Sequence, residues 1–211
     1  MAKVAKPSQV KKTSVGLIGA GSMGGALLRG WLEGGIIDAA RSAIFDPAVP
    51  DQNRMTAQTA GMAINPGKDL AVDVLVVAVK PQISASILPD FAESAASACV
   101  LSVMAGKTIA AISGELGGAP RVARAMPNLP SSIGKGACGL YAPPAIDADM
   151  RKRLATLLAA SGVVVSVESE EAIDVVTAIS GSGPAYFFLF TQALEKAGVA
   201  LGLAPADAAL L

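Results

Sequence analysis

Histidine is absent from the 211-residue sequence, and only two cysteines and one tryptophan are present. Without histidine, triads and dyads that use an imidazole base are excluded, and a zinc site loses its commonest ligand. The cysteines, Cys99 and Cys138, are too few for a disulfide framework, so we expect both to be small buried residues in a reducing compartment. We expect no metal ion, and any chemistry must rely on a bound cofactor or on backbone dipoles.

An excess of charge of either sign is also lacking, because 17 basic residues balance 17 acidic ones. This balance excludes the basic field that nucleic-acid binding requires. We find neither an apolar run of membrane-spanning length nor the apolar block of a signal peptide. The expectation is a soluble cytoplasmic protein without nucleic-acid or membrane partners, with a disordered leader at residues 1–12.

What the sequence does contain is a regular alternation of apolar runs and helical patterns over residues 13–168. Val74–Val79 is a continuous β-branched run, typical of a strand buried on both faces of a parallel sheet. Further strands are expected at 14–18, 43–45, 100–104, 121–125 and 163–167, and helices at 23–33, 108–116 and 154–160. This alternation predicts an α/β fold built on a doubly wound parallel sheet.

The pattern becomes helical in residues 169–211, which we take as a second segment. It starts at Ile173, is interrupted by Ser180–Pro184, and resumes as a further helix from Pro205. Residues 186–190 (YFFLF) place apolar side chains on all sides of a helix, which must then be covered by other helices. The rest of the chain cannot supply that cover, so we expect a second subunit to provide it.

A glycine-rich turn, G-A-G-S-M-G, follows the first expected strand and opens the first helix. The first glycine permits the tight turn, the second lets the backbone approach a diphosphate, and the third allows the helix to pack on the strand. Backbone N–H groups at the helix start then face the anion. We therefore expect the diphosphate of a dinucleotide to contact Gly19, Ala20, Gly21, Ser22, Met23 and Gly24.

Asp46 follows the second expected strand, where a residue that reads the adenosine ribose belongs, although it comes later than the usual ~20 residues after the glycines. A carboxylate there binds both ribose hydroxyls and repels a 2′-phosphate, which favours NADH over NADPH. Two alternatives stay open. Arg41 and Arg54 could serve a phosphate instead, or Asp46 could only cap a turn before Pro47.

Five separated motifs, in this order, resemble those of pyrroline-5-carboxylate reductases. They are VGLIGAGSMGGALLRG, VVAVKPQ (Val76–Gln82), SVMAGKT, RVARAMPNLPSSIGKG (Arg121–Gly136) and the most distinctive one, ISGSGPAYFFLF (Ile179–Phe190). The resemblance runs from about Ser14 to Leu211. It implies a Rossmann-type domain that binds NADPH or NADH, then the start of an all-helical dimerisation domain, and a homodimer or higher homo-oligomer.

The resemblance also implies further site residues, mostly where strands end, the edge at which ligands bind in open α/β sheets. The cofactor contacts implied in this way are Asn65, Ala78, Val79, Lys80, Pro81, Ala105, Gly106 and Asn128. Candidate catalytic residues are Lys80 near the nicotinamide, Glu170 as a contact to the ring nitrogen, and Ser182 beside the substrate. Each has a plainer reading, as a loop lysine, a surface glutamate and a helix start.

The implied reaction transfers a hydride from NAD(P)H to the C=N bond of 1-pyrroline-5-carboxylate, a small cyclic imine, and gives L-proline. A protonated imine is already electrophilic, so a chain without histidine can act by positioning the reactants.

The family's later Ser-Pro-Gly-Gly-Thr-Thr loop, which holds the substrate carboxylate, is not found. We therefore expect a truncated form or a protein that has lost this loop, and a non-catalytic dinucleotide-binding protein stays an alternative. A β-hydroxyacid dehydrogenase-like enzyme is another, with Lys196 as the one lysine after residue 168.

Overall fold

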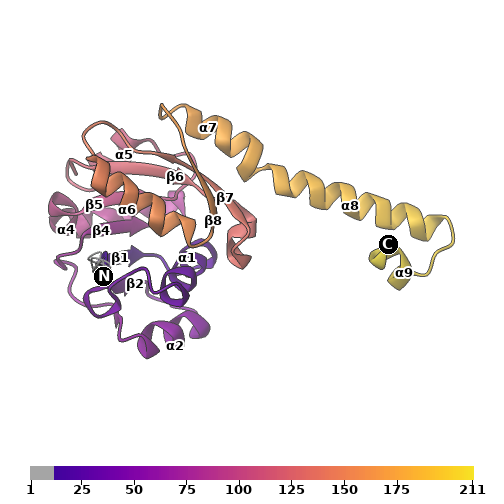
Figure 1. The fold of residues 1–211 in the computed structure, drawn as a ribbon, viewed down its shortest axis with the longest axis horizontal. Coiled ribbons are helices and arrows are strands. Elements are labelled where there is room, and N and C mark those ends of the chain that lie inside the picture. Colours follow the sequence, from indigo (N-terminus) through magenta and orange to yellow (C-terminus); the bar gives the residue numbers. More distant parts are fainter. Residues whose placement is uncertain (1–11) are drawn as a thin grey trace, which may run out of the picture.

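The computed structural model describes residues 12–211, so the expected leader lies outside the described residues except for Lys12. Eight strands form one sheet in the order β3-β2-β1-β4-β5-β6-β7-β8 (Figure 1). The strands are β1 (Val15–Ile18), β2 (Ala43–Phe45), β3 (Ala63–Ile64), β4 (Val74–Val77), β5 (Cys99–Ser102), β6 (Val122–Met126), β7 (Gly136–Tyr141) and β8 (Gly162–Ser166).

Helices cover both faces of this sheet and continue beyond it. They are α1 (Ser22–Glu33), α2 (Asp51–Thr59), α3 (Ser84–Ile87), α4 (Ala92–Ser97), α5 (Ile109–Glu115), α6 (Ala148–Ala159), α7 (Ala172–Val176), α8 (Gly183–Ala200) and α9 (Pro205–Leu210). The α/β fold expected from the sequence is therefore confirmed. Strand order runs outward in both directions from β1 and β4, as in a doubly wound Rossmann-type sheet.

The sheet is not parallel throughout, which corrects one expectation. Strands β1 to β6 are parallel, but β7 runs antiparallel to β6, and β8 then pairs parallel with β7. The connection between β6 and β7 holds only a short 3₁₀ turn, Leu129–Ile133. A parallel crossover needs about a dozen residues or more, so this shorter connection reverses the chain direction.

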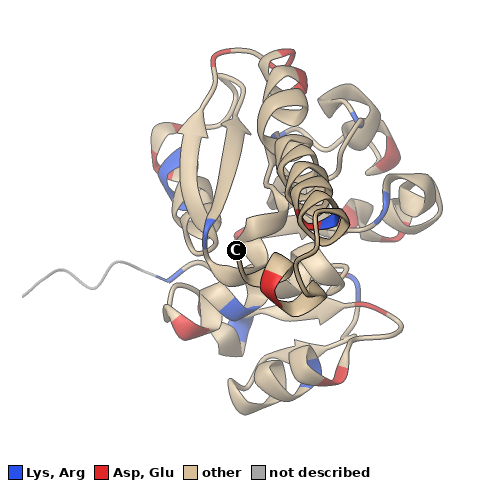
Figure 2. Ribbon diagram, turned by 90° about the vertical axis from the view of Figure 1, so that its right-hand side faces the viewer, with Lys and Arg blue, Asp and Glu red and all other residues tan. Residues whose placement is uncertain are grey.

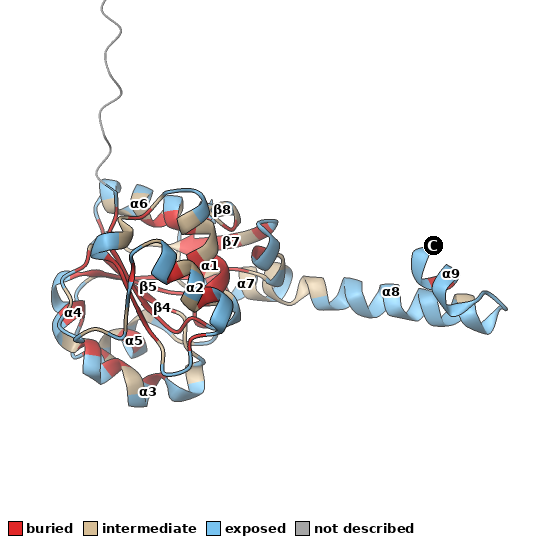
Figure 3. Cartoon of the chain, turned by 90° about the horizontal axis from the view of Figure 1, so that it is seen from below, coloured by how far each residue is buried: buried red, intermediate tan, exposed pale blue. Residues whose placement is uncertain are grey.

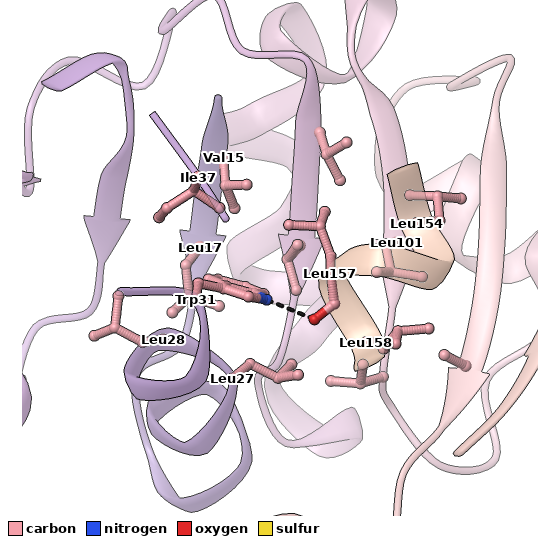
Figure 4. Packing of buried hydrophobic residues seen from close by; sticks show 14 of the residues in the cluster. Val15, Leu17, Leu27, Leu28, Trp31, Ile37, Leu101, Leu154, Leu157 and Leu158 are labelled. Carbon is pink, nitrogen blue, oxygen red and sulfur yellow. Dashed lines mark hydrogen bonds between the residues drawn. The ribbon is translucent and has the colours of Figure 1, made fainter. Parts of the chain in front are cut away.

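Two apolar layers enclose the sheet, one on each face. In the first layer the fully buried Trp31 of α1 donates its indole N–H to the Leu157 carbonyl of α6 at 2.7 Å (Figure 4). This bond fixes the helix that carries the glycine-rich turn against its neighbour. Cys99 and Cys138 are buried, as expected, both in the same layer as Trp31.

Several elements differ from those expected. The sequence reading missed α2, β3, β7 and the helical turns between residues 81 and 97. Helix α6 was expected from residue 154 but begins at Ala148, because the Asp147 carboxylate accepts a hydrogen bond from the Met150 amide at 2.8 Å.

The expected interruption at Ser180–Pro184 is also wrong, because α7 and α8 form one continuous helix over Ala172–Ala200. Pro184 has no N–H for an intrahelical bond. The helix accommodates the proline with a π-helical turn, Thr177–Gly181, in which the Ser182 amide donates to the Thr177 carbonyl at 2.9 Å. What reads as a loop in the sequence is a widened helical turn.

Helix α8 projects away from the sheet, and α9 folds back against its far end (Figure 1). Residues 186–190 are 58–75% exposed, and most of α8 is pale blue in Figure 3. Together α7, α8 and α9 form a helical arm (residues 172–211). By length and composition the helix Ala172–Ala200 could cross a membrane, which corrects the expectation that no run reaches that length. An uncovered apolar helix of this kind requires a partner surface.

Candidate functional site

The glycine-rich turn lies between β1 and α1, and each glycine has a distinct steric environment. Gly19 has φ +92°, and an added Cβ would lie 2.8 Å from the Ala78 carbonyl oxygen. A Cβ on Gly24 would lie 2.0 Å from the Gly19 carbonyl oxygen, whereas one on Gly21 would meet nothing within 4 Å. The outer glycines are needed for packing, and the middle one leaves open space beside the backbone.

This open side belongs to a cavity of about 690 Å³ at the carboxyl ends of β1, β2 and β4. Such an edge is where ligands bind in doubly wound sheets. Of the expected cofactor contacts, the cavity is lined by Gly19, Gly21, Asp46, Asn65, Ala78, Val79 and Lys80. Ala20, Ser22, Met23, Gly24, Pro81, Ala105, Gly106 and Asn128 are not among its lining residues.

Asp46 both accepts hydrogen bonds from nearby backbone amides and lines the cavity. Its Oδ2 accepts a hydrogen bond from the Ala20 amide and its Oδ1 accepts one from the Ala48 amide, each at 2.8 Å. The carboxylate therefore caps the turn around Pro47 and also braces the glycine-rich turn while it lines the cavity. The two expected readings of Asp46 do not exclude each other.

Asn65 holds the backbone of Asp46. Its side-chain oxygen accepts from the Asp46 amide and its side-chain nitrogen donates to the Asp46 carbonyl, both at 2.9 Å. Asn65 has φ +51°, a left-handed conformation that asparagine tolerates better than most residues. The alternative cations, Arg41 and Arg54, do not line the cavity, and Arg41 lies 4.0 Å from Asp38.

Lys68 is a cavity residue that sequence reasoning missed. It forms an ion pair with Asp90, and its ammonium lies 5.6 Å from the centre of the Phe91 ring, all three residues lining the cavity. Lys68 follows β3 in a loop, where nothing in the sequence distinguishes it from a solvated lysine. Asp90 offsets the charge that Lys68 brings to the cavity rim.

Glu170 lies at the start of the helical segment and is bound to two other elements. Its Oε1 accepts a hydrogen bond from Arg124 Nη1 at 3.0 Å and from the Ile109 amide at 2.7 Å. The guanidinium of Arg124, in β6, is 4% exposed, and its Nη2 lies 3.8 Å from Asp174. This ion pair joins β6, α5 and α7, and the sequence did not identify Arg124 as its centre.

Asn128 and Ser180 make a second connection between the sheet domain and the helical arm. Asn128 donates to the Ser180 hydroxyl at 3.2 Å, and its side-chain oxygen accepts from the Ala137 amide at 2.9 Å. Ser182 follows the π-helical turn and is partly exposed, while Lys80 is exposed at the mouth of the cavity. The structure therefore separates the three candidate catalytic residues between the cavity and the base of the arm.

The site fits a dinucleotide and offers little to a metal ion. The first hydrogen bond of α1 runs from the Gly25 amide to the Gly21 carbonyl at 2.7 Å. The amides before Gly25 therefore have no acceptor within the helix and can face an anion. Within residues 12–211 no group of three or more acidic, cysteine or histidine side chains could hold a metal ion. Figure 2 shows basic and acidic residues interspersed over the same part of the chain.

Comparisons with known proteins agree with this arrangement. A family model described as pyrroline-5-carboxylate reductase dimerisation matches residues 170–211, and one described as NADP oxidoreductase coenzyme F420-dependent matches residues 14–106. A pyrroline-5-carboxylate reductase of Pseudomonas aeruginosa is 34% identical over 200 residues, which cover 93% of this chain and 73% of the relative. One from Mycobacterium tuberculosis is 35% identical, covering 90% and 66%.

Solved structures give the same result. A pyrroline-5-carboxylate reductase from Coxiella burnetii matches with a TM-score of 0.83 and 33% identity, covering 94% of this chain and 75% of that one. A Plasmodium falciparum pyrroline carboxylate reductase with NADP bound matches with a TM-score of 0.80 and 27% identity, covering 94% and 74%. The chain thus spans about two thirds to three quarters of the length of these relatives.

Proposed function

Because the chain belongs to the pyrroline-5-carboxylate reductase family, we propose that it binds NAD(P)H and reduces the C=N bond of 1-pyrroline-5-carboxylate to give L-proline. The observation that carries the proposal is the cavity of about 690 Å³ into which the glycine-rich turn opens. The bound cofactor supplies the hydride, so the protein's task is to bind, orient and exclude water.

Cofactor binding falls to residues on the carboxyl ends of three neighbouring strands. The amides of Gly21, Ser22 and Met23 bind the diphosphate at the start of α1, where the helix dipole favours an anion. Asp46 binds the adenosine ribose, held in place by Asn65. Ala78, Val79 and Lys80 line the same cavity beyond β4 and extend the site along the sheet edge.

We place the imine between this sheet edge and the base of the helical arm. Asn128 holds Ser180, so the π-helical turn and Ser182 stay close to the end of β6. Lys80 and Ser182 are the candidate contacts to the substrate. Glu170 has one carboxylate oxygen bound to Arg124 and Ile109, which leaves its second oxygen for the expected contact to the ring nitrogen.

Two finer features belong to the same proposal. NADH is preferred over NADPH, because the Asp46 carboxylate faces the cavity and the charge of Lys68 is offset by Asp90. A second copy of the chain covers the exposed apolar surface of α8, supported by the match to a dimerisation family over residues 170–211. A location in the cytoplasm stays a prediction.

Parallel titrations with NADH and NADPH, followed by nicotinamide fluorescence, test the binding part of the proposal. We expect NADH to have the lower dissociation constant. Asp46→Ala should reduce the ratio of the two dissociation constants, because it removes the charge that repels a 2′-phosphate. Asp51→Ala, which changes an exposed carboxylate outside the cavity, is the control and should leave this ratio unchanged.

Proline formation from the imine, measured with the same protein, tests the reaction. Turnover supports the reductase assignment. Binding without turnover would instead favour the alternative of a non-catalytic dinucleotide-binding protein. Tighter binding of NADPH by the wild-type chain would contradict the role given to Asp46.

A further inference from the structure

The peptide groups on both sides of Ala20, in the glycine-rich turn, are held by side chains from two other elements. Its amide donates to Asp46 Oδ2 at 2.8 Å, from the end of β2. Its carbonyl accepts a hydrogen bond from Asn53 Nδ2, also at 2.8 Å, from helix α2. Ala20 itself is buried, and so is the bond from Asn53, for which water competes weakly.

The bond from Asn53 has a direct consequence for the next residue. The Ala20 carbonyl and the Gly21 amide belong to one planar peptide unit, in which C=O and N–H point in opposite directions. A donor that fixes the carbonyl therefore aims the Gly21 N–H away from Asn53. Gly21 is exposed and lines the cavity, so its amide lies within reach of a ligand bound there.

The Asn53 side chain is held firmly in turn. It is 4% exposed, and its Oδ1 accepts a hydrogen bond from Arg29 Nη1 at 2.8 Å. Its amide lies against α1 at Gly25, where an added Cβ would come within 2.2 Å of Nδ2. With its donor and its acceptor both used, the amide has one orientation that satisfies the network.

We propose that Asn53 is a positioning residue for diphosphate binding, which acts through the Ala20–Gly21 peptide. This inference rests on the proposed dinucleotide binding. Asn53 does not line the cavity and touches the cofactor site only through the turn. Its bond to the Ala20 carbonyl fixes and polarises the Gly21 amide, so that no reorientation is needed when the anion binds.

Two variants remove the donor while preserving the packing. Asn53→Asp keeps the shape and the acceptor for Arg29 but presents no N–H to the Ala20 carbonyl. Asn53→Ala combined with Gly25→Ala fills the vacated space with a methyl group. Gln52→Ala, an exposed neighbour on α2, is the matched control.

The double variant should bind NADH and NADPH about fivefold to tenfold more weakly, the range of one net hydrogen bond. Asn53→Asp should bind both at least as weakly, because it also adds a negative charge near the diphosphate. The loss should be equal for the two cofactors, since they share the diphosphate, and Gln52→Ala should bind like the wild type. In proteins labelled with ¹⁵N-glycine, the Gly21 amide proton should move upfield in both variants, because its peptide is no longer polarised. A merely structural role for Asn53 would not produce this selective shift.

Unchanged dissociation constants and an unchanged Gly21 resonance in the folded double variant would overturn the inference, even if Asn53→Asp failed to fold. A donor-free variant that loses NADPH affinity but keeps NADH affinity would also overturn it. If the wild-type chain binds neither dinucleotide, the proposed function itself fails, and the positioning role fails with it. If the wild-type chain binds both dinucleotides, the variants test the role of Asn53 alone.

Discussion

Removing the two partners of the Arg124–Glu170 ion pair one at a time should destabilise the protein unequally. The Arg124 side chain is 4% exposed and that of Glu170 is 26% exposed. In Arg124→Met, the Glu170 carboxylate keeps its bond from the Ile109 amide and can gain water. In Glu170→Ala, the buried guanidinium keeps only the Asp174 carboxylate, 3.8 Å away, as a partner among the described residues.

The magnitudes follow from this difference in burial. Breaking a buried pair so that one charge stays uncompensated in the interior costs about 3–5 kcal/mol. The cost is smaller when the charge left behind is partly exposed, as that of Glu170 is, because water can solvate it. Asp174 and partial water access reduce the first figure. We therefore expect Glu170→Ala to lower the free energy of unfolding by about 3 kcal/mol and Arg124→Met by about 1 kcal/mol.

Urea unfolding followed by the fluorescence of Trp31, the single tryptophan, measures both values. Glu168→Ala removes an exposed glutamate two residues away and should change the free energy by less than about 0.5 kcal/mol. Glu170→Gln, which keeps one side-chain oxygen to accept from Arg124 and Ile109 but carries no charge, should fall between Glu170→Ala and the wild type. An Arg124→Met variant as unstable as Glu170→Ala, or less stable, would refute the reasoning from burial.

Two further predictions concern the arm and the thiols. Phe188→Glu should weaken self-association roughly a hundredfold, because a buried Phe contributes about 3 kcal/mol and each 1.4 kcal/mol is a factor of ten. Light scattering over a range of concentrations measures this, with Gln58→Glu on α2 as a charge-matched control outside the arm. A monomeric wild type would contradict the prediction. Burial raises the pKa of Cys99 from 9.0 to about 11 and that of Cys138 to about 12. Since the folded-state pKa values are raised, the stabilisation is present below pH 9 and is lost as the pH rises toward 11–12. Between pH 8 and pH 10.5 each buried thiol should therefore cost the wild type about 1–2 kcal/mol of unfolding free energy. The double variant Cys99→Ala/Cys138→Ala should not show this loss. Equal pH dependence of the unfolding free energy in the two proteins would contradict the raised pKa values.

The parallel part of the fold could be predicted because its strands carry their own signal. The run Val74–Val77 is β-branched and buried on both faces, and β2 was expected with the bounds it has. Strand β7 was missed because its sequence, GACGLY, contains two glycines and little β propensity. Helix α2 was missed because its sequence, DQNRMTAQT, buries only Asn53 and Ala57, too few for an amphipathic pattern.

The π-helical turn shows a different limit. Serine, glycine and proline at 180–184 indicate a loop when taken locally, but the helix on either side is strong enough to continue through them. Helix α7, which precedes the π-helical turn, contacts β6 and β7 and so holds the start of this turn against the sheet. At this position tertiary packing outweighs the low helix propensity of serine, glycine and proline. Single π-helical turns of this kind are frequent at functional sites.

For the site, the residues could be predicted better than their partners. The glycine-rich turn and Asp46 follow from spacing along the chain. The bond from Ala20 to Asp46 joins residues 26 apart, and the Arg124–Glu170 bond joins residues 46 apart. Such contacts depend on how β2, β6 and α7 meet in space, which hydrophobic periodicity does not encode.

The double use of Asp46 limits how its coenzyme selectivity can be redesigned. An engineer who replaces this residue with a small or basic one, to admit the bulkier phosphorylated nucleotide, also deletes the acceptor for the Ala20 and Ala48 amides. The gain in tolerance for the extra phosphate would be offset by a looser loop, and both nucleotides would bind less well. A successful switch would keep a neutral acceptor at 46, such as asparagine or serine, and introduce the new cation elsewhere on the rim.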